Sequence, residues 1–234
     1  MKVGIITAIW KRPEVWEMFK RRISNLKKLK GLTIEVFVGG SEDWTEDACR
    51  GFNYVHIDNE PLGRKMNAAA ALARDSDCTH FIFVGSDDLI GNDLMKLYMR
   101  EKDSADYLYL LDCFFFDVSS KKGLYWGGYD LDANRGHASG AGRMFNRSLM
   151  EKLNFQPWHD VQMSTILDTS MNDKLARTPH TRKGFKCLTE NVFIVDIKSS
   201  TNMTPFEKWH NTIEISGKFL FNYLPQTEAT QIYE

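Results

Sequence analysis

Short apolar runs separated by helix-forming segments dominate the first 100 residues of the chain. Runs rich in aliphatic, β-branched and aromatic residues predict buried strands at residues 2–9, 33–38, 54–57 and 80–84. Between the first two runs, apolar residues recur at spacings of three and four, which predicts an amphipathic helix that begins near Pro13. The residues of this helical face are Val15, Phe19, Ile23 and Leu26. Residues 64–74, which are rich in alanine, and residues 93–100 predict two further helices.

The second half of the chain is less regular. We predict, in chain order, a strand at 107–112, a loop-rich segment at 123–142 with six glycines, a helix at 146–153, a helix from Asp168 or Thr169, a strand at 191–197 and a helix over 204–224 that Gly217 weakens.

Alternating strands and helices, with strands that are apolar throughout, predict an α/β fold with a mainly parallel central sheet and flanking helices. Its 234 residues fit a single domain, and no internal repeat or Pro/Gly/Ser-rich linker divides it. In sheets of this kind, ligands bind at the carboxyl ends of the strands. The residues that follow each apolar run are therefore the candidates for chemistry.

Composition narrows the class of protein further. The chain has 43% hydrophobic and 26% charged residues, and a net charge of −1, which is typical of a globular protein and excludes a disordered or collagen-like one. Four cysteines without a Cys-x-x-Cys pair give no support for a zinc ribbon, and a reducing cytosol is the simplest compartment. No apolar run is long enough to span a bilayer, so we expect a cytoplasmic protein.

The near-neutral total conceals an uneven distribution of charge. Residues 1–30 carry nine bases and two acids (+7), residues 31–120 seven bases and seventeen acids (−10), and residues 121–234 fourteen bases and twelve acids (+2). The bases of the first helix face solvent if its apolar face packs inward, and they would suit an anionic partner or solubility alone.

The most informative motif is Gly85-Ser86-Asp87-Asp88, directly after the apolar run 80–84. Adjacent carboxylates after a buried strand are costly unless they are solvated, cap a helix or hold a cation. A hard cation such as Mg²⁺ or Mn²⁺, shared with a substrate diphosphate, suits this position. The alternative is an ordinary turn before a helix.

Two further segments have binding chemistry at the same predicted edge. Arg64 and Lys65 stand at a helix start, where basic side chains and backbone N–H groups can meet phosphate oxygens, although a basic helix surface is the commoner explanation of such a pair. Trp10 offers a flat face for a nucleobase and Arg12 a fork for a phosphate, whereas the alternative for Trp10 is an ordinary core position.

Together these segments resemble the GT-A-fold glycosyltransferases, close to the large family 2. The resemblance covers residues 2 to about 97 and, more loosely, 140–198. Thr7 to Pro13 stand where the family has a TxxxRP-like segment, and Gly63 and Asn67 match its Gly-x-x-x-Asn helix start. Gly85 to Asp88 take the place of its metal-binding Asp-x-Asp element, and Gly140 to Arg143 resemble its glycine-rich acceptor-side segment.

The resemblance implies a single Rossmann-like GT-A domain over residues 1–234, with residues 1–100 binding the nucleotide sugar and residues 101–234 the acceptor. It implies Mn²⁺ or Mg²⁺ held by Asp87 and Asp88. It implies donor contacts from Thr7, Ala8, Trp10, Arg12, Gly40, Ser41, Arg64, Lys65, Asn67, Ser86 and Lys198.

The sequence departs from the family at three positions. Gly85 replaces the first Asp of Asp-x-Asp, and Gly39-Gly40-Ser41 replaces the Asp-Asp-Gly-Ser whose carboxylate reads the nucleobase. Met66 stands where the family has Arg, with Arg64 and Lys65 nearby. A UDP-sugar is the expected donor, although the carboxylate that reads the nucleobase in the family is missing here.

An inverting transferase of this type also needs a carboxylate that takes the proton of the acceptor hydroxyl. Asp168 at a predicted helix start and Asp160 after Trp158 are the two candidates. We favour Asp168, for which a helix N-cap is the alternative role.

The sequence therefore predicts a metal-dependent glycosyltransferase whose acceptor is a glycan, a small molecule or a modified base of DNA. A catalytically silent nucleotide-sugar-binding protein is one alternative, because Gly85 removes a carboxylate. A sugar-phosphate nucleotidyltransferase is another, although the glycine-rich, Arg-bearing loop of that class is absent after the first predicted strand.

Overall fold

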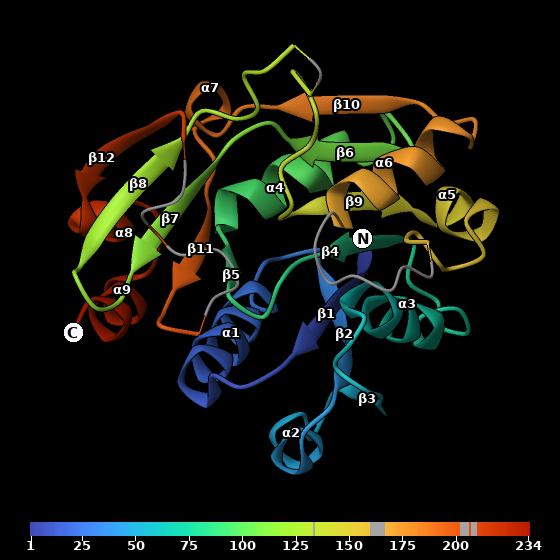
Figure 1. The fold of residues 1–234 in the computed structure, drawn as a ribbon, viewed down its shortest axis with the longest axis horizontal. Helices are drawn as coiled ribbons and strands as arrows, with labels where there is room; N and C mark the ends of the chain where they lie inside the picture. Colours follow the sequence, from blue (N-terminus) through green and yellow to red (C-terminus); the bar gives the residue numbers. More distant parts are fainter. Residues whose placement is uncertain (133, 160–166, 202–205, 207–209) are drawn as a thin grey trace.

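The computed structural model describes residues 1–132, 134–159, 167–201, 206 and 210–234. Within them, the larger of two sheets has the strand order β10-β6-β9-β4-β1-β2-β3 (Figure 1). Its strands are β1 (Lys2–Ile9), β2 (Thr33–Gly40), β3 (Asn53–His56), β4 (His80–Phe83), β6 (Tyr107–Leu110), β9 (Arg143–Asn146) and β10 (Arg182–Phe185). The pairs β1–β2, β1–β4, β2–β3 and β6–β10 are parallel, whereas β9 is antiparallel to both β4 and β6. The predicted mainly parallel central sheet is confirmed.

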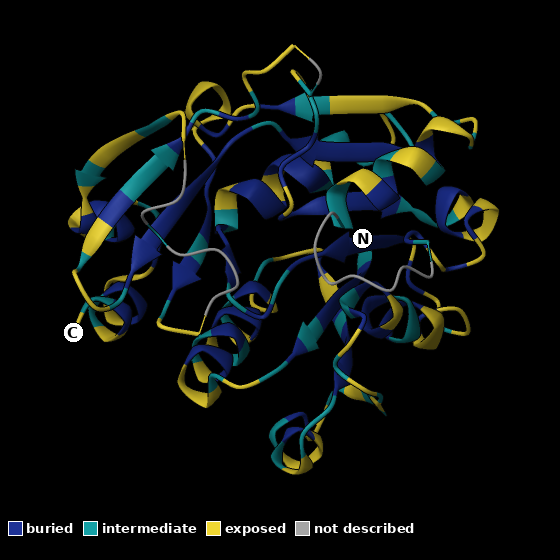
Figure 2. Ribbon diagram, viewed as in Figure 1, coloured by how far each residue is buried: buried dark blue, intermediate teal, exposed yellow. Residues whose placement is uncertain are grey.

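Helices cover both faces of this sheet, as the predicted α/β class requires. Val3 and Ile5 pack on the side of α1 (Pro13–Leu26) and α4 (Asn92–Glu101). Ile6 and its neighbours on the other side pack with α3 (Leu62–Leu72), α5 (Arg147–Lys152) and α6 (Leu167–Ala176). Figure 2 shows most of β1, β2, β4 and β6 in the colour of buried residues, whereas the edge strand β10 and the outer faces of the helices are largely exposed. The chain adds the short helices α2 (Asp43–Ala48), α7 (Cys187–Glu190), α8 (Leu220–Tyr223) and α9 (Gln226–Tyr233) and a 3₁₀ turn at Gly217–Phe219.

A second, smaller sheet stands beside the first, and the sequence pattern did not predict it. Its order is β12-β8-β7-β11-β5, shown on the left of Figure 1. Its strands are β5 (Asp88–Ile90), β7 (Cys113–Asp117), β8 (Lys122–Trp126), β11 (Ile194–Lys198) and β12 (Thr212–Ser216). Antiparallel pairing of β5 with β11 sets Asp88 opposite Asp196. This register joins the metal-motif segment to a strand more than 100 residues later in the chain.

Two predictions for the second half are wrong in part. Thr212–Ser216 lies inside the segment 204–224 predicted as a helix, but it forms an edge strand antiparallel to β8. Threonine and isoleucine favour a strand once a partner edge is available, and no local pattern reveals that edge. Similarly, the glycine-rich segment 123–142 begins inside β8, where Gly123 leaves room for the ring of Phe219.

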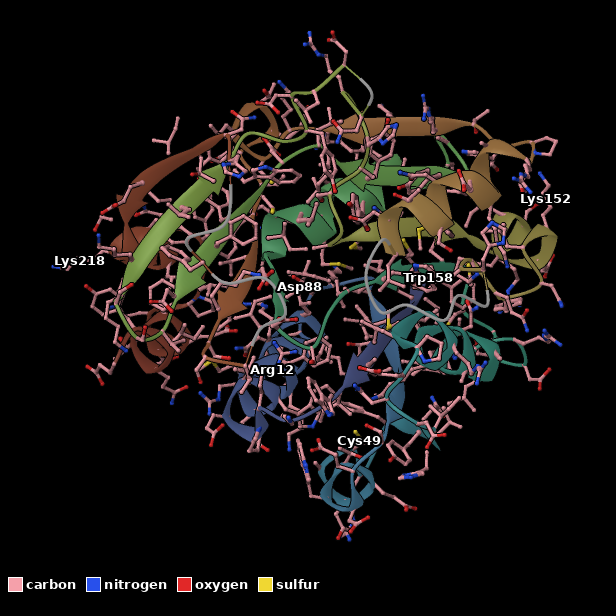
Figure 3. The ribbon with its side chains drawn as sticks, viewed as in Figure 1. Arg12, Cys49, Asp88, Lys152, Trp158 and Lys218 are labelled. Carbon is pink, nitrogen blue, oxygen red and sulfur yellow. The ribbon has the colours of Figure 1, made fainter. Side chains whose placement is uncertain are left out.

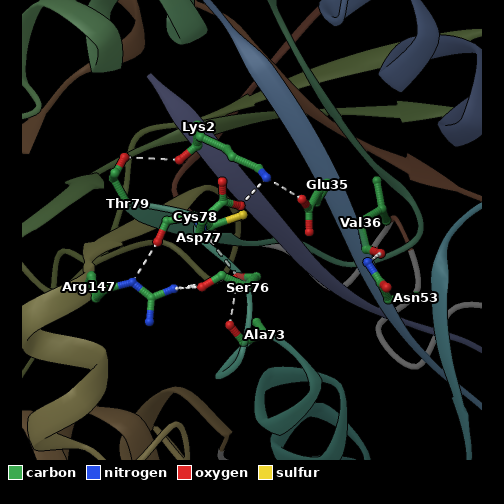
Figure 4. Close-up of polar contacts among 10 residues, drawn as sticks. All are labelled: Lys2, Glu35, Val36, Asn53, Ala73, Ser76, Asp77, Cys78, Thr79 and Arg147. Carbon is green, nitrogen blue, oxygen red and sulfur yellow. Dashed lines mark hydrogen bonds and ion pairs between the residues drawn. The ribbon is translucent and has the colours of Figure 1, made fainter.

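Polar contacts hold the amino ends of the central strands together (Figure 4). Lys2 at the start of β1 forms ion pairs with Glu35 of β2 and with Asp77, and its carbonyl accepts from the Thr79 hydroxyl at 3.0 Å. Arg147 of α5 donates from Nε to the carbonyl of Cys78 at 2.8 Å. None of these residues lines the cavity described below, which lies at the opposite, carboxyl end of β1 and β4.

Among the described residues, no helix is both long and apolar enough to cross a membrane.

Candidate active site

A cavity of about 410 Å³ opens between the carboxyl ends of β1 and β4 and the smaller sheet. Of the residues predicted as donor contacts, metal ligands or catalytic base, nine line it: Ala8, Trp10, Arg12, Lys65, Ser86, Asp87, Asp88, Asp168 and Lys198. Gly140, Ala141 and Arg143 of the predicted acceptor-side segment line it too. Arg12 and Asp88 are labelled near the centre of Figure 3, with Trp158 farther along toward α3 and α6. Segments from both halves of the chain thus meet in one cavity.

Asp87, Asp88 and Asp196, here called the carboxylate trio, form one end of this cavity. One oxygen from each lies within 4.8 Å of the others. Asp196 comes from β11 and was not predicted as a ligand. Its only sequence signal is a carboxylate inside the apolar run Ile194–Lys198. It supplies a third carboxylate where Gly85 removed one from the motif.

Gly85 has a steric reason to be glycine. A Cβ at this position would lie 2.4 Å from Oδ1 of Asp87 and 3.2 Å from Oδ2 of Asp88. Its backbone N–H donates to Oδ2 of Asp88 at 2.5 Å. The missing side chain makes room for the two carboxylates that remain.

Two cationic side chains lie against the trio. Arg12 pairs with Asp87 (Nη1–Oδ2 2.5 Å), and Lys198 pairs with Asp196 (Nζ–Oδ2 2.6 Å). Arg12 has a φ of 62° and the preceding Lys11 a φ of 51°, a left-handed conformation that costs non-glycine residues of the order of 1 kcal/mol or more. This backbone turns the chain between β1 and α1 and holds the Arg12 guanidinium at the trio.

The trio retains more negative charge than these contacts neutralise. Burial, together with the charges of Asp196 and Asp87, raises the pKa of Asp88 well above its usual value. Burial and the charge of Asp87 raise the pKa of Asp196 to about 6, although Lys198 opposes the shift. Oδ1 of Asp196 is buried without a hydrogen-bond partner among the described residues. Three carboxylates with converging oxygens, and an Asp196 oxygen without a hydrogen-bond partner among the described residues, fit a hard divalent cation such as Mg²⁺ or Mn²⁺.

Asp168 lines the cavity at a second place, here called the Asp168 end. It lies in the first turn of α6, where a helix N-terminus favours a carboxylate. Oδ1 accepts from Arg143 Nη2 at 2.8 Å, and Oδ2 accepts from the Tyr129 hydroxyl at 3.1 Å. Burial, followed by the charge of Asp168, raises the pKa of Tyr129, so this phenol remains a donor at neutral pH. Asp160, the other candidate base, lies outside the described residues.

Lys65 lies in the cavity wall but has structural partners. Its Nζ donates to the carbonyl of Ile9 at 2.6 Å, to Oγ of Ser41 at 2.9 Å and to Oδ1 of Asn59 at 3.1 Å. Burial lowers the pKa of Lys65 to about 8. The side chain ties the carboxyl ends of β1 and β2 to the segment before α3.

The other predicted donor contacts lie outside the cavity lining. Thr7 is buried within β1, Ser41 binds Lys65, and Arg64 lies at the exposed surface of α3. A Cβ at Gly40 would lie 2.5 Å from Thr45 and Tyr54, so this glycine is required for packing. For these residues donor contact stays a prediction.

Asn67 was predicted to contact the donor, and in the structure its side chain binds the backbone of Trp158. Its amide donates to the Trp158 carbonyl at 3.0 Å and accepts from the Trp158 N–H at 3.2 Å. Trp158 lines the cavity and packs edge-on against Phe83 of β4. Asn67 therefore fixes one aromatic wall of the cavity from behind.

Comparison with solved structures identifies the architecture. Staphylococcus aureus TarS in complex with UDP-GlcNAc matches 100% of this chain and 70% of its own, at 13% identity and a TM-score of 0.56. The catalytic domain of Drosophila β1,4-galactosyltransferase 7 with xylobiose matches 90% of this chain and 76% of its own, at 13% identity and a TM-score of 0.51. This chain has the GT-A fold.

A further structure of the Drosophila enzyme, a mutant in complex with manganese, UDP-Gal and xylobiose, has the same GT-A architecture. It matches 88% of this chain and 77% of its own, at 12% identity and a TM-score of 0.50. No family model matches the sequence, and no curated protein matches it. At these identities the likeness to GT-A structures concerns the fold, and the chemistry must be argued from the cavity itself.

Proposed function

We propose that the protein is a metal-dependent glycosyltransferase that moves a sugar from a nucleotide-sugar donor, with a UDP-sugar as the expected one, to an acceptor hydroxyl. The observation that carries this proposal is the single cavity with the carboxylate trio at one place and Asp168 at another. A transfer of this type needs both, because one group neutralises the leaving diphosphate and another removes the acceptor proton. The likeness to GT-A structures that hold UDP-GlcNAc or manganese with UDP-Gal supports the same reaction class.

At the trio, Asp87, Asp88 and Asp196 would hold Mn²⁺ or Mg²⁺, which when bound acts as a Lewis acid toward the diphosphate. Arg12 and Lys198 bring positive charge to the same place and orient the diphosphate oxygens. The Trp10 ring, also in the cavity lining, offers a face for the nucleobase.

At the other end of the cavity, Asp168 acts as the general base. As the acceptor oxygen attacks the anomeric carbon, its proton passes to Asp168 and a new carbon–oxygen bond forms. The bond from the anomeric carbon to the diphosphate breaks, and its electron pair leaves with the nucleoside diphosphate. A single displacement of this kind inverts the configuration at that carbon.

The acceptor is a glycan or a small hydroxyl compound in this proposal. Trp126, Tyr129 and Trp158 line the cavity together with Asp168, and aromatic faces of this kind pack against the apolar face of a sugar ring. We infer a cytoplasmic location, because all four cysteines are buried free thiols, as a reducing compartment maintains them.

The test is a panel of nucleotide sugars with Mn²⁺, scored by thermal shift and by nucleotide release with candidate acceptors. We expect at least one donor to raise Tm in the presence of Mn²⁺. The variant Asp168→Asn should bind that donor normally and transfer its sugar about 1,000-fold more slowly, the usual loss when a general base is removed. If no nucleotide sugar binds with or without the metal, the proposal is wrong.

A further inference from the structure

Arg143 lies behind Asp168 with almost no contact with solvent. It belongs to β9, the antiparallel strand between β4 and β6, and is 1% exposed. Placing an arginine there is costly unless its charge and its N–H groups have partners. The contacts of the Arg143 side chain therefore indicate its role.

Three contacts fix the plane of the Arg143 guanidinium. Nε donates to the Ser139 carbonyl at 2.8 Å, Nη2 to the Ala138 carbonyl at 3.2 Å, and Nη1 contacts the Met171 sulfur at 2.9 Å. Ala138 and Ser139 precede β9, whereas Met171 belongs to α6, one turn after Asp168. The guanidinium is thus held from two elements, and Nη2 also reaches Oδ1 of Asp168 at 2.8 Å.

Asp168 itself is constrained but not enclosed. Arg143 holds Oδ1 and Tyr129 holds Oδ2, so both oxygens have a defined direction. The side chain is nevertheless 37% exposed and lines the cavity. The carboxylate is fixed from behind and remains accessible from the cavity.

Gly140 leaves the approach to this carboxylate open. A Cβ at position 140 would lie 3.6 Å from both Oδ1 and Oδ2 of Asp168, at ordinary van der Waals distance. Gly140 has no positive φ in the structure, so the backbone does not demand glycine there. An added methyl group would fit without strain and would stand against both carboxylate oxygens.

We propose that Arg143 is the positioning residue of Asp168: its buried guanidinium and the Tyr129 hydroxyl fix the carboxylate, and Gly140 leaves it open to the acceptor hydroxyl. This inference rests on the proposed function, in which Asp168 is the base. Arg143 also lines the cavity, but its three nitrogens already have partners in Ala138, Ser139, Met171 and Asp168, so in this inference it acts on the reaction through Asp168. A carboxylate displaced by about 1 Å loses of the order of 100-fold in rate.

A double-mutant cycle tests this coupling. We expect Arg143→Met to lower kcat about 100-fold and Asp168→Asn about 1,000-fold, with donor binding in Mn²⁺ unchanged in both. In the Asp168→Asn background, Arg143→Met should lower kcat by less than about threefold further, since it acts through the carboxylate. Arg143→Lys, which keeps the charge but loses the fork, should recover part of the loss.

The matched control is Arg147→Met. Arg147 also binds backbone carbonyls, those of Cys78 and Ser76, but it lies outside the cavity lining. Its replacement should lower Tm and leave kcat within about twofold. If the losses from Arg143→Met and Asp168→Asn multiply in the double variant, the positioning role is overturned.

Two milder variants decide the question if Arg143→Met does not fold. Tyr129→Phe removes one hydroxyl and should lower kcat about 5- to 10-fold, with the loss absent in the Asp168→Asn background. Gly140→Ala should raise the acceptor KM about 10-fold and leave the donor KM unchanged. The proposal is overturned if Gly140→Ala has a normal acceptor KM and the losses in kcat from Tyr129→Phe and Asp168→Asn multiply in the double variant.

These outcomes are distinct from failure of the proposed function itself. If the donor binds but Asp168→Asn transfers sugar at the normal rate, the base assignment is wrong, and the Arg143 inference is overturned with it. If Asp168→Asn is inactive but the cycle is additive, the base assignment stands and only the role of Arg143 is overturned.

Discussion

At the carboxylate trio, three acidic side chains crowd together and one buried oxygen of Asp196 has no hydrogen-bond partner among the described residues. At the Asp168 end, a single carboxylate has a buried arginine on one oxygen and a phenol on the other. The carboxylates of the trio outnumber the cationic side chains that contact them, whereas Asp168 has one cationic partner, Arg143.

This difference separates two uses of the same functional group. Crowded and incompletely neutralised carboxylates take up a cation, because each one raises the free energy of its ionised neighbours. A carboxylate that is paired and hydrogen-bonded keeps one orientation, which suits a proton acceptor. In the proposed function, the trio binds a cation, whereas Asp168 is a carboxylate held in one orientation.

Replacing one carboxylate at each place should separate the two roles most strongly. Asp87→Ala should abolish the Mn²⁺-dependent rise in Tm with a nucleotide sugar and lower kcat/KM about 1,000-fold or more, since several kcal/mol of charge stabilisation are lost. Asp168→Asn should leave that rise in Tm intact. Calorimetric titration with Mn²⁺ and donor checks both, and an equal loss of metal-dependent binding in the two variants would contradict the division of roles.

The pH dependence of stability should differ between the trio and an exposed carboxylate by a smaller amount. The pKa of Asp196 is raised to about 6 in the folded protein, above the value of about 4 in an unfolded chain. The folded state therefore binds the proton of Asp196 more tightly than the unfolded chain does. The contribution of Asp196 to the free energy of unfolding falls as the pH rises from about 4 through 6. In EDTA, Asp196→Asn should gain stability relative to the natural protein over this range, by a few degrees in Tm.

Two controls accompany this measurement. Mn²⁺ should remove the pH-dependent difference, because a bound cation compensates the ionised Asp196. The exposed carboxylate variant Asp47→Asn should show no such pH dependence of Tm, since Asp47 has an exposed ion pair with Arg50. The prediction is contradicted if the difference in Tm between the natural protein and Asp196→Asn is constant from pH 4 to 7. In that case burial and the charge of Asp87 do not destabilise the ionised form of Asp196.

Neutralising the basic residues that follow α1 should change activity least. Lys27, Lys28 and Lys30 are exposed and lie outside the cavity lining. Their joint replacement by Gln should change kcat/KM for a glycan or small acceptor by less than about twofold. A large loss of activity that depends steeply on salt would instead point to a polyanionic acceptor such as DNA.

Much of the trio and its setting could be predicted from the sequence. The apolar runs predicted β1, β2, β3 and β4 to within a few residues, because parallel strands buried on both faces have a strong local signal. The position of Asp87 and Asp88 at the end of such a run predicted where carboxylates gather. Trp10, Arg12 and Lys198 were predicted donor contacts and do line the cavity.

Other features depended on partners far along the chain. Asp196 joins the trio only through the antiparallel register of β11 with β5, and β12 becomes a strand only because the edge of β8 accepts it. No local sequence pattern predicts either pairing, because the register of a strand depends on the partner strand that it meets.

The alternation of strands and helices, the class of sheet and the carboxyl edge at which polar residues collect can all be predicted from the sequence. Each of these follows from the local spacing of apolar residues. Which charged groups share that edge depends on the folded arrangement of distant segments. Folding brought Asp196 to Asp88 and Arg143 to Asp168, over separations of 108 and 25 residues. Charge balance depends on distances in space, and folding sets those distances.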